Sequence, residues 1–241
     1  MSQLELNQVP DAETADSRWH LLYKVGGAAA LFSVVIIPIQ IIVYIASPPP
    51  DTAIGWFNLF QDNKLLGLLA FEVLFIVNAA LGITTTLALY IALRRANESF
   101  MAIALAFGLV GTVAIIIARP AFDMLYLSEQ YAAATTDAQR AMFLAAGEAM
   151  LAIVNGTAFH VSYVLASINL LIIPVVMLRS NIFSKATAYI GILAGIFGFG
   201  LYVPKIGIIL SIISVMPFYA IWYILIARRL FQLGHGEPIP E

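Results

Sequence analysis

Long apolar stretches alternate with short polar connections along most of this chain. A helix rises about 1.5 Å per residue, so roughly 20 apolar residues cross a hydrocarbon core of about 30 Å. Six stretches come close to that length or exceed it. They predict six transmembrane helices, at residues 21–46, 65–93, 100–118, 157–178, 186–203 and 206–230.

The ends of the chain are polar. Residues 1–18 carry Glu5, Asp11, Glu13 and Asp16 with little apolar content, which predicts a mobile acidic tail. A signal peptide would have a basic start and a shorter apolar run, so we expect the first span to be retained as an anchor. Residues 19–233 then form the transmembrane domain, and residues 234–241 form a short C-terminal tail.

The connection between the third and fourth spans, from about Ala121 to Val154, has a helix signal of its own. Thr136 and Gln139 match a capping box, in which each side chain accepts a hydrogen bond from an amide of the first turn. Asn155-Gly156 then predicts a break. The fold class is therefore an all-α membrane protein, a six-transmembrane-helix bundle with one extra capped, amphipathic helix. Residues 53–60 are short and aromatic, which suggests the membrane interface.

Composition supports this class and excludes several functions. The chain is 61% hydrophobic and 11% charged, against about 25% charged in a typical soluble domain. There is no basic cluster for nucleic acid and no cysteine for a thiolate site. Walker, EF-hand, dinucleotide and GxSxG motifs are absent too. We expect no cofactor and no catalytic residue. The expected partners are the lipid bilayer and, as an open possibility, another membrane protein or a second copy; a small-molecule ligand stays unknown.

The cations favour one orientation. With the N-terminus inside, eight of the twelve Lys and Arg residues are cytoplasmic, as the positive-inside rule expects. These eight are Arg18, Lys24, Arg94, Arg95, Arg179, Lys185, Arg228 and Arg229, and the outer four are Lys64, Arg119, Arg140 and Lys205. We expect a prokaryotic cytoplasmic membrane with both termini in the cytoplasm.

Polar residues inside the spans form a candidate intramembrane site. Glu72 is costly in lipid and should face protein or water. Asn78 follows it, and the fourth span repeats Asn155, Ser162 and Asn169 every seven residues. One interpretation is a proton or cation site. The other is structural: a protonated or Arg-paired acid about one and a half turns below the outer surface, with interhelical hydrogen bonds from the stripe.

Further polar residues should gather at the outer end of the bundle. This candidate outer cluster contains Arg119, Asp123, Glu148, His160 and Lys205. A mixed metal site of Glu72, Glu148 and His160 is conceivable. However, the chain has three histidines, two of them expected in the cytoplasm, so we predict no metal site.

Small residues recur at helix-packing spacing. Ala104, Gly108 and Thr112 do so in the third span, and Gly191 and Gly195 in the fifth. Such stripes let backbones approach closely in lipid, and packing within one bundle is favoured over a dimer face.

The order of these features resembles the prokaryotic integral-membrane proteins grouped as domain of unknown function 4386, over residues 18–233. The likeness rests on residues 18–31, Phe71-Glu72, residues 87–90, residues 178–185, Gly191, Leu201-Tyr202 and Trp222. The resemblance implies six spans and a membrane location and assigns no reaction. Residues 214–219 lack the acid expected before Trp222, which argues against a paired-acid mechanism.

Three functions are compatible with the sequence. The first is a non-enzymatic interaction or accessory subunit, because the polar residues can all be explained by packing. The alternative is a small ion or solute transporter with an outward-facing cavity around Glu72. The third is an intramembrane metal-dependent enzyme.

Overall fold

The structure, a computed structural model, describes residues 17–236, which form helices without any strand. Residues 1–16 of the predicted acidic tail and residues 237–241 of the C-terminal tail lie outside the described part. The α-helices are α1 (His20–Ala46), α2 (Ala53–Asp62), α3 (Lys64–Ala70), α4 (Val73–Leu93), α5 (Glu98–Ile117), α6 (Ala121–Ala133), α7 (Asp137–Val154), α8 (Thr157–Met177), α9 (Lys185–Phe199), α10 (Gly207–Ile213) and α11 (Ala220–Gly234).

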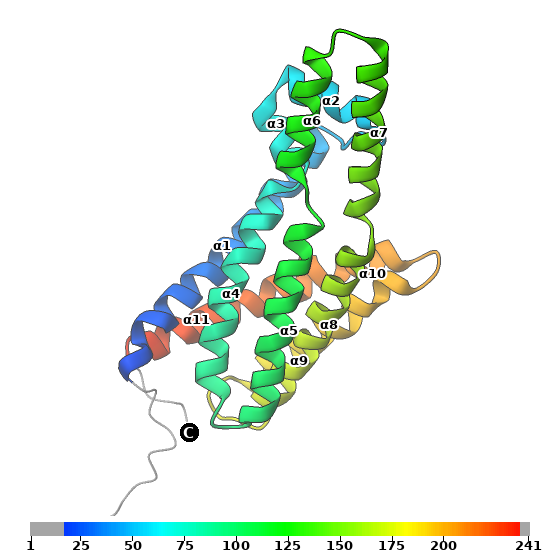
Figure 1. The fold of residues 1–241 in the computed structure, drawn as a ribbon. Coiled ribbons are helices and arrows are strands. Elements are labelled where there is room, and N and C mark those ends of the chain that lie inside the picture. The colour runs from blue at the N-terminus through cyan, green and yellow to red at the C-terminus, as the bar shows by residue number, and fades with distance from the viewer. Residues whose placement is uncertain (1–16, 237–241) are drawn as a thin grey trace, which may run out of the picture.

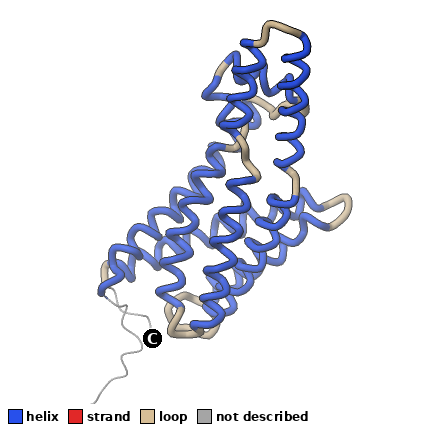
Figure 2. The backbone as a smooth tube through the Cα atoms, in the orientation of Figure 1, coloured by secondary structure: helices blue, strands red, loops and turns tan. Residues whose placement is uncertain are grey.

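The helices form two groups (Figure 1). The bundle consists of α1, α4, α5, α8, α9 and the α10–α11 rod, in which the π-helical segment Ser214–Tyr219 joins α10 to α11. The head consists of the shorter helices α2, α3, α6 and α7 and extends from one end of the bundle. Figure 2 shows loops where the chain passes between the two groups.

The bundle helices follow one another around a ring. α1 packs on α4, α4 on α5, α5 on α8 and α8 on α9, while α11 closes the ring against α1. Within residues 17–236, six helices are long and apolar enough to cross a membrane. The predicted fold class is therefore confirmed. Gly234 at the end of α11 lies against His20 and Lys24, so both ends of the described chain are at the end opposite the head.

Side-chain caps explain where several helices begin. The Asn97 side chain accepts the Phe100 amide at 3.0 Å before α5, and Ser184 accepts the Thr187 amide at 3.1 Å before α9. The capping box of Thr136 and Gln139 is present at α7, and this helix ends at Val154, at the predicted Asn155-Gly156 break. These caps satisfy amides that the first turn leaves without an intrahelical partner.

Glycine lets the bundle helices touch. A Cβ on Gly26 would meet Ala88 of α4 at 2.5 Å, and one on Gly191 would meet Pro174 and Trp222 at 2.5 Å. Gly108 faces Thr86 and Asn169 of two neighbouring helices. The predicted small-residue stripes thus pack inside one bundle, as the sequence favoured.

The head has a separate core. Trp56, Phe57 and Phe60 of α2 are buried against α6 and the end of α3, and Trp56 meets Phe71 edge-on at 4.6 Å between ring centroids. The location of residues 53–60 in the membrane interface stays a prediction. The aromatic face of α2 is covered by protein because α6 and α7 fold back over it.

Two predicted segments are divided differently in the structure. Residues 65–93 form two helices, α3 and α4, with a break at Phe71-Glu72. The connection at residues 121–154 contains α6 as well as the predicted capped helix α7. Apolar content alone hides both features, because the head helices bury apolar faces of their own.

Candidate functional site

One hydrogen-bonded network occupies the boundary between head and bundle. The chain passes between head and bundle four times, and we call these passages the crossings. Each crossing contributes one residue to the network: Tyr44 near the end of α1, Glu72 between α3 and α4, Arg119 between α5 and α6, and Val154 at the end of α7. We call these four residues the junction.

Glu72 is held by an unusual backbone conformation. Its φ of 64° is left-handed, and Lys205 is the other non-glycine residue with a positive φ in the described chain. Residues other than Gly, Asn and Asp rarely adopt this backbone conformation, and the exceptions cluster at functional and ligand-binding sites. The turn ends α3, and the carbonyl of Glu72 accepts the first bond of α4, from the Phe75 amide at 2.8 Å. Glu72 is therefore the N-cap residue of α4, although its side chain makes no capping hydrogen bond.

Both carboxylate oxygens of Glu72 are bonded. The Tyr44 hydroxyl donates to Oε1, and the Arg119 Nε–H donates to Oε2. The Nη1 of Arg119 also donates to the carbonyls of Ala118 at 3.1 Å and Val154 at 3.0 Å. These carbonyls belong to the C-terminal ends of α5 and α7, where a cation is favoured. Arg119 thus joins three of the four crossings by itself.

Two aromatic rings complete the surroundings of Arg119. The guanidinium carbon lies 5.6 Å from the ring centroid of Phe75 and 5.2 Å from that of Phe159, within cation–π range. The Arg119 side chain is 6% exposed and the Glu72 side chain 25%. Because a buried charge is tolerated only when paired, each of these two groups is needed by the other.

The position of Glu72 relative to the helices differs from the expectation. The sequence placed it inside a continuous second span, whereas the structure places it at the α3–α4 break, one residue before α4 begins. It also connects Glu72 of the predicted intramembrane site to Arg119 of the predicted outer cluster. Because their charges neutralise each other, Glu72 and Arg119 can stay partly buried and connect the crossings.

Sequence reasoning missed Tyr44 and Gln40. They lie four residues apart on α1, and the Gln40 Nε2 donates to the Leu69 carbonyl at 3.1 Å. A polar residue and a tyrosine on one face near the C-terminal end of the first span were a usable signal. The pairing with Glu72 was not visible, because the α3–α4 break could not be predicted.

The remaining residues of the predicted intramembrane site are spread over the bundle. Asn155 is exposed at the end of α7, and buried Ser162 donates to the Phe159 carbonyl at 2.7 Å. Asn169 packs beside Gly108, and its Oδ1 is buried without a hydrogen-bond partner among the described residues, as is that of Asn78. The structure does not bring these residues to Glu72 by any described hydrogen bond.

The predicted outer cluster is likewise divided among separate partners. Glu148 accepts the Ala53 amide at 2.8 Å and so caps α2 inside the head. The His160 Nδ1 lies 3.3 Å from the Tyr202 hydroxyl, and Asp123 is exposed in the first turn of α6. Among the described residues, no group of three His, Cys, Asp or Glu side chains could hold a metal ion.

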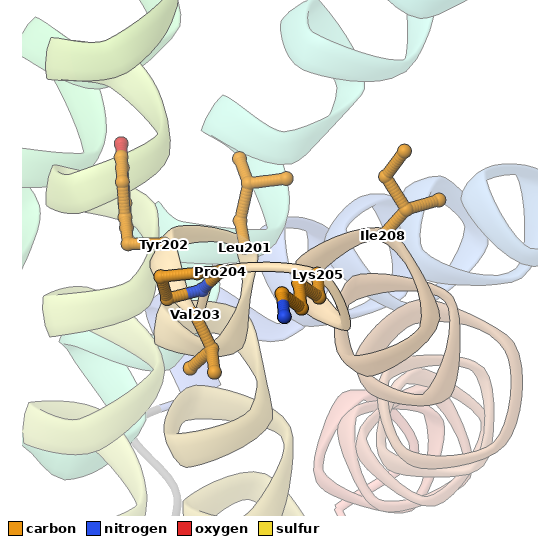
Figure 3. A pocket seen from close by; sticks show the side chains of 7 residues that line it. Leu201, Tyr202, Val203, Pro204, Lys205 and Ile208 are labelled. Atoms are coloured by element: carbon orange, nitrogen blue, oxygen red, sulfur yellow. The ribbon is translucent and has the colours of Figure 1, made fainter.

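Lys205 lies in the loop that joins α9 to α10. This loop surrounds a shallow hollow of about 310 Å³ (Figure 3), lined by Leu201, Tyr202, Val203, Pro204, Lys205, Gly207 and Ile208. The hollow is open, and Lys205 is its one charged side chain.

Comparison with known families decides the classification. Residues 21–233 match the family described as Domain of unknown function (DUF4386). The chain belongs to this family. The match covers the whole bundle and head of the DUF4386 chain, including the junction, and confirms the resemblance seen in the sequence. No curated protein and no solved structure matches it.

Proposed function

We propose that this DUF4386 protein is a non-enzymatic integral membrane protein that acts as an interaction or accessory subunit. In this account the bundle is the anchor and the head is the part that meets a partner. The observation that carries the proposal is the bonding of both Glu72 oxygens to Tyr44 and Arg119. An acid occupied in this way serves as a joint between helices and is not free to bind a solute.

The head supports this role by its surface. Phe122 and Tyr126, one turn apart on α6, are exposed, and so is Met142 on α7. Exposed aromatic and Met side chains are enriched where proteins meet. The partner is another membrane protein or a second copy of this chain.

The orientation of the proposal follows from the cations. Arg94, Arg95 and Arg179 lie in the loops at the bundle end opposite the head, and Lys185 is the first residue of α9 at the same end. The positive-inside rule then places this end and both termini in the cytoplasm, with the head outside a prokaryotic cytoplasmic membrane. A reporter fused to the C-terminus should be active only in its cytoplasmic form, and an exported reporter would reverse this orientation.

Site-specific photo-crosslinking in native membranes tests the interaction role. A photoreactive amino acid replaces Phe122 or Met142, and the matched control replaces Ile212, which is equally apolar and exposed on α10 of the bundle. We expect a discrete protein adduct from the head positions and lipid adducts from the control. Failure of both head positions to form a protein adduct would contradict the proposal.

The second candidate, a small transporter, is favoured by the buried amide oxygens of Asn78 and Asn169 that lack partners. A flux measurement on the purified protein in vesicles distinguishes the interaction role from transport. We expect no flux of protons or monovalent cations above that of empty vesicles. A flux that disappears in a folded Asn78→Leu variant would replace the interaction role by transport.

A further inference from the structure

Buried polar atoms without partners follow one face of α1. Ser33 is 0% exposed and Gln40 is 9% exposed. The Ser33 Oγ and the Gln40 Oε1 have no hydrogen-bond partner among residues 17–236. Seven residues, about two helical turns, separate them, so both project from the same side of the helix.

The partner helix places a third such atom at the level of Ser33. The Thr85 hydroxyl donates to the Gly26 carbonyl at 3.1 Å, which fixes the register of α4 against α1. The two helices run in opposite directions, so Asn78, seven residues before Thr85, is at the level of Ser33, seven residues after Gly26. The Asn78 Oδ1 is also buried and without a partner in the described chain.

These atoms call for a small hydrogen-bonding ligand. Buried polar groups normally have a partner, and the exceptions commonly mark ordered water. The Gln40 amide is fixed in this orientation, because reversing it would place Oε1 against the Leu69 carbonyl oxygen that Nε2 now binds. Water can donate to the two amide oxygens and accept from Ser33.

We infer that a file of water molecules runs along the α1–α4 interface from the junction, past Gln40, to Ser33 and Asn78. Its outer end is at Glu72, the partly exposed member of the junction pair. Gln40 lies between, since its Nε2 reaches Leu69 three residues before Glu72. The file goes beyond the proposed function, which needs only an anchored head.

Cysteine accessibility tests this inference without a background, because the chain has no cysteine. Ser33→Cys is nearly isosteric and should fold. Vesicles with the head outward are exposed to silver ion, which is about the size of water, and free thiols are then counted by alkylation after denaturation. The matched control is Val35→Cys. Val35 lies on the exposed face of the same helix, which faces lipid in the proposed membrane protein.

We expect Ser33→Cys to react at least about tenfold faster than Val35→Cys, since the reactive thiolate forms where water solvates it. Adding Gln40→Leu should slow the reaction at Ser33→Cys to the control rate. Thr135→Cys, in the exposed α6–α7 loop, verifies that the reagent is active. Equal slow reaction at residues 33 and 35 would overturn the water file, and fast reaction that persists with Gln40→Leu would overturn its route.

Discussion

At the scale of single residues, Glu72 needs a partner for its charge and a left-handed backbone conformation, and the sequence shows these requirements only in part. An acid inside the second span was predicted to face protein or water, and a protonated or Arg-paired acid was one of its two interpretations. The left-handed conformation was not predictable, because no glycine or asparagine marks the turn. The bond to Tyr44 could not be foreseen without that turn.

The backbone of Glu72 leads to a first prediction. Glu72→Asn and Glu72→Val both remove the carboxylate, but Asn tolerates a positive φ and a β-branched residue does not. We expect the Asn variant to be more stable than the Val variant by about 1–2 kcal/mol. Unfolding of the two purified variants in mild detergent measures the difference. Equal stability would mean that the turn relaxes when the carboxylate is lost.

The charge of Glu72 leads to a second prediction. Glu72→Gln leaves the buried guanidinium of Arg119 without its anion, and we expect a loss of about 2–4 kcal/mol in the free energy of unfolding. Glu129→Gln is the control, since Glu129 pairs with Lys64 at 2.5 Å on the surface of the head. That change should cost less than about 1 kcal/mol. Similar losses for the two variants would show that the Glu72–Arg119 pair stabilises the fold no more than a surface ion pair does.

At the scale of elements, strong local signals were predicted well and tertiary choices were not. The capping box and the Asn155-Gly156 break follow from side-chain chemistry within a few residues, and both are present. The division of residues 65–93 depends on α3 packing beside α2 and α6. Hydropathy along the chain contains no information on that contact.

Alanine substitutions at two glycines distinguish the effect of close packing on stability from the effect of helix propensity. A Cβ on Gly191 would lie 2.5 Å from Pro174 and Trp222, whereas a Cβ on Gly82 would meet nothing within 4 Å. We expect Gly191→Ala to destabilise the bundle and Gly82→Ala to be neutral or to stabilise it by up to about 1 kcal/mol. Thermal unfolding of both variants compares them directly. A stable Gly191→Ala protein would contradict the close α8–α9–α11 packing.

The capping box has a local consequence. Thr136→Ala removes the acceptor for the Gln139 amide, which Thr136 Oγ1 binds at 3.2 Å. Loss of such a cap costs about 0.5–2 kcal/mol and should act on the first turn of α7. Hydrogen exchange should therefore accelerate at residues 137–140 and stay unchanged in the bundle helices. Faster exchange throughout the protein would contradict a role confined to the cap.

At the scale of the whole molecule, a six-helix bundle and a head meet at one network. The bundle was predictable because apolar length is a global property of the sequence. The head was recognised only as its capped helix α7, since its apolar faces resemble extensions of the spans. The junction decides how the two parts are held, because its hydrogen bonds connect all four crossings.

The most direct test of this joint is the distance between head and bundle. Spin labels on Thr135→Cys, in the exposed loop of the head, and Ser99→Cys, at the far end of α5, report that distance by electron paramagnetic resonance. With Glu72 and Arg119 intact, we expect one narrow distance distribution. Adding Glu72→Gln should broaden it, because the head is then released from the bundle. An equally narrow, unshifted distribution in that variant would contradict the account.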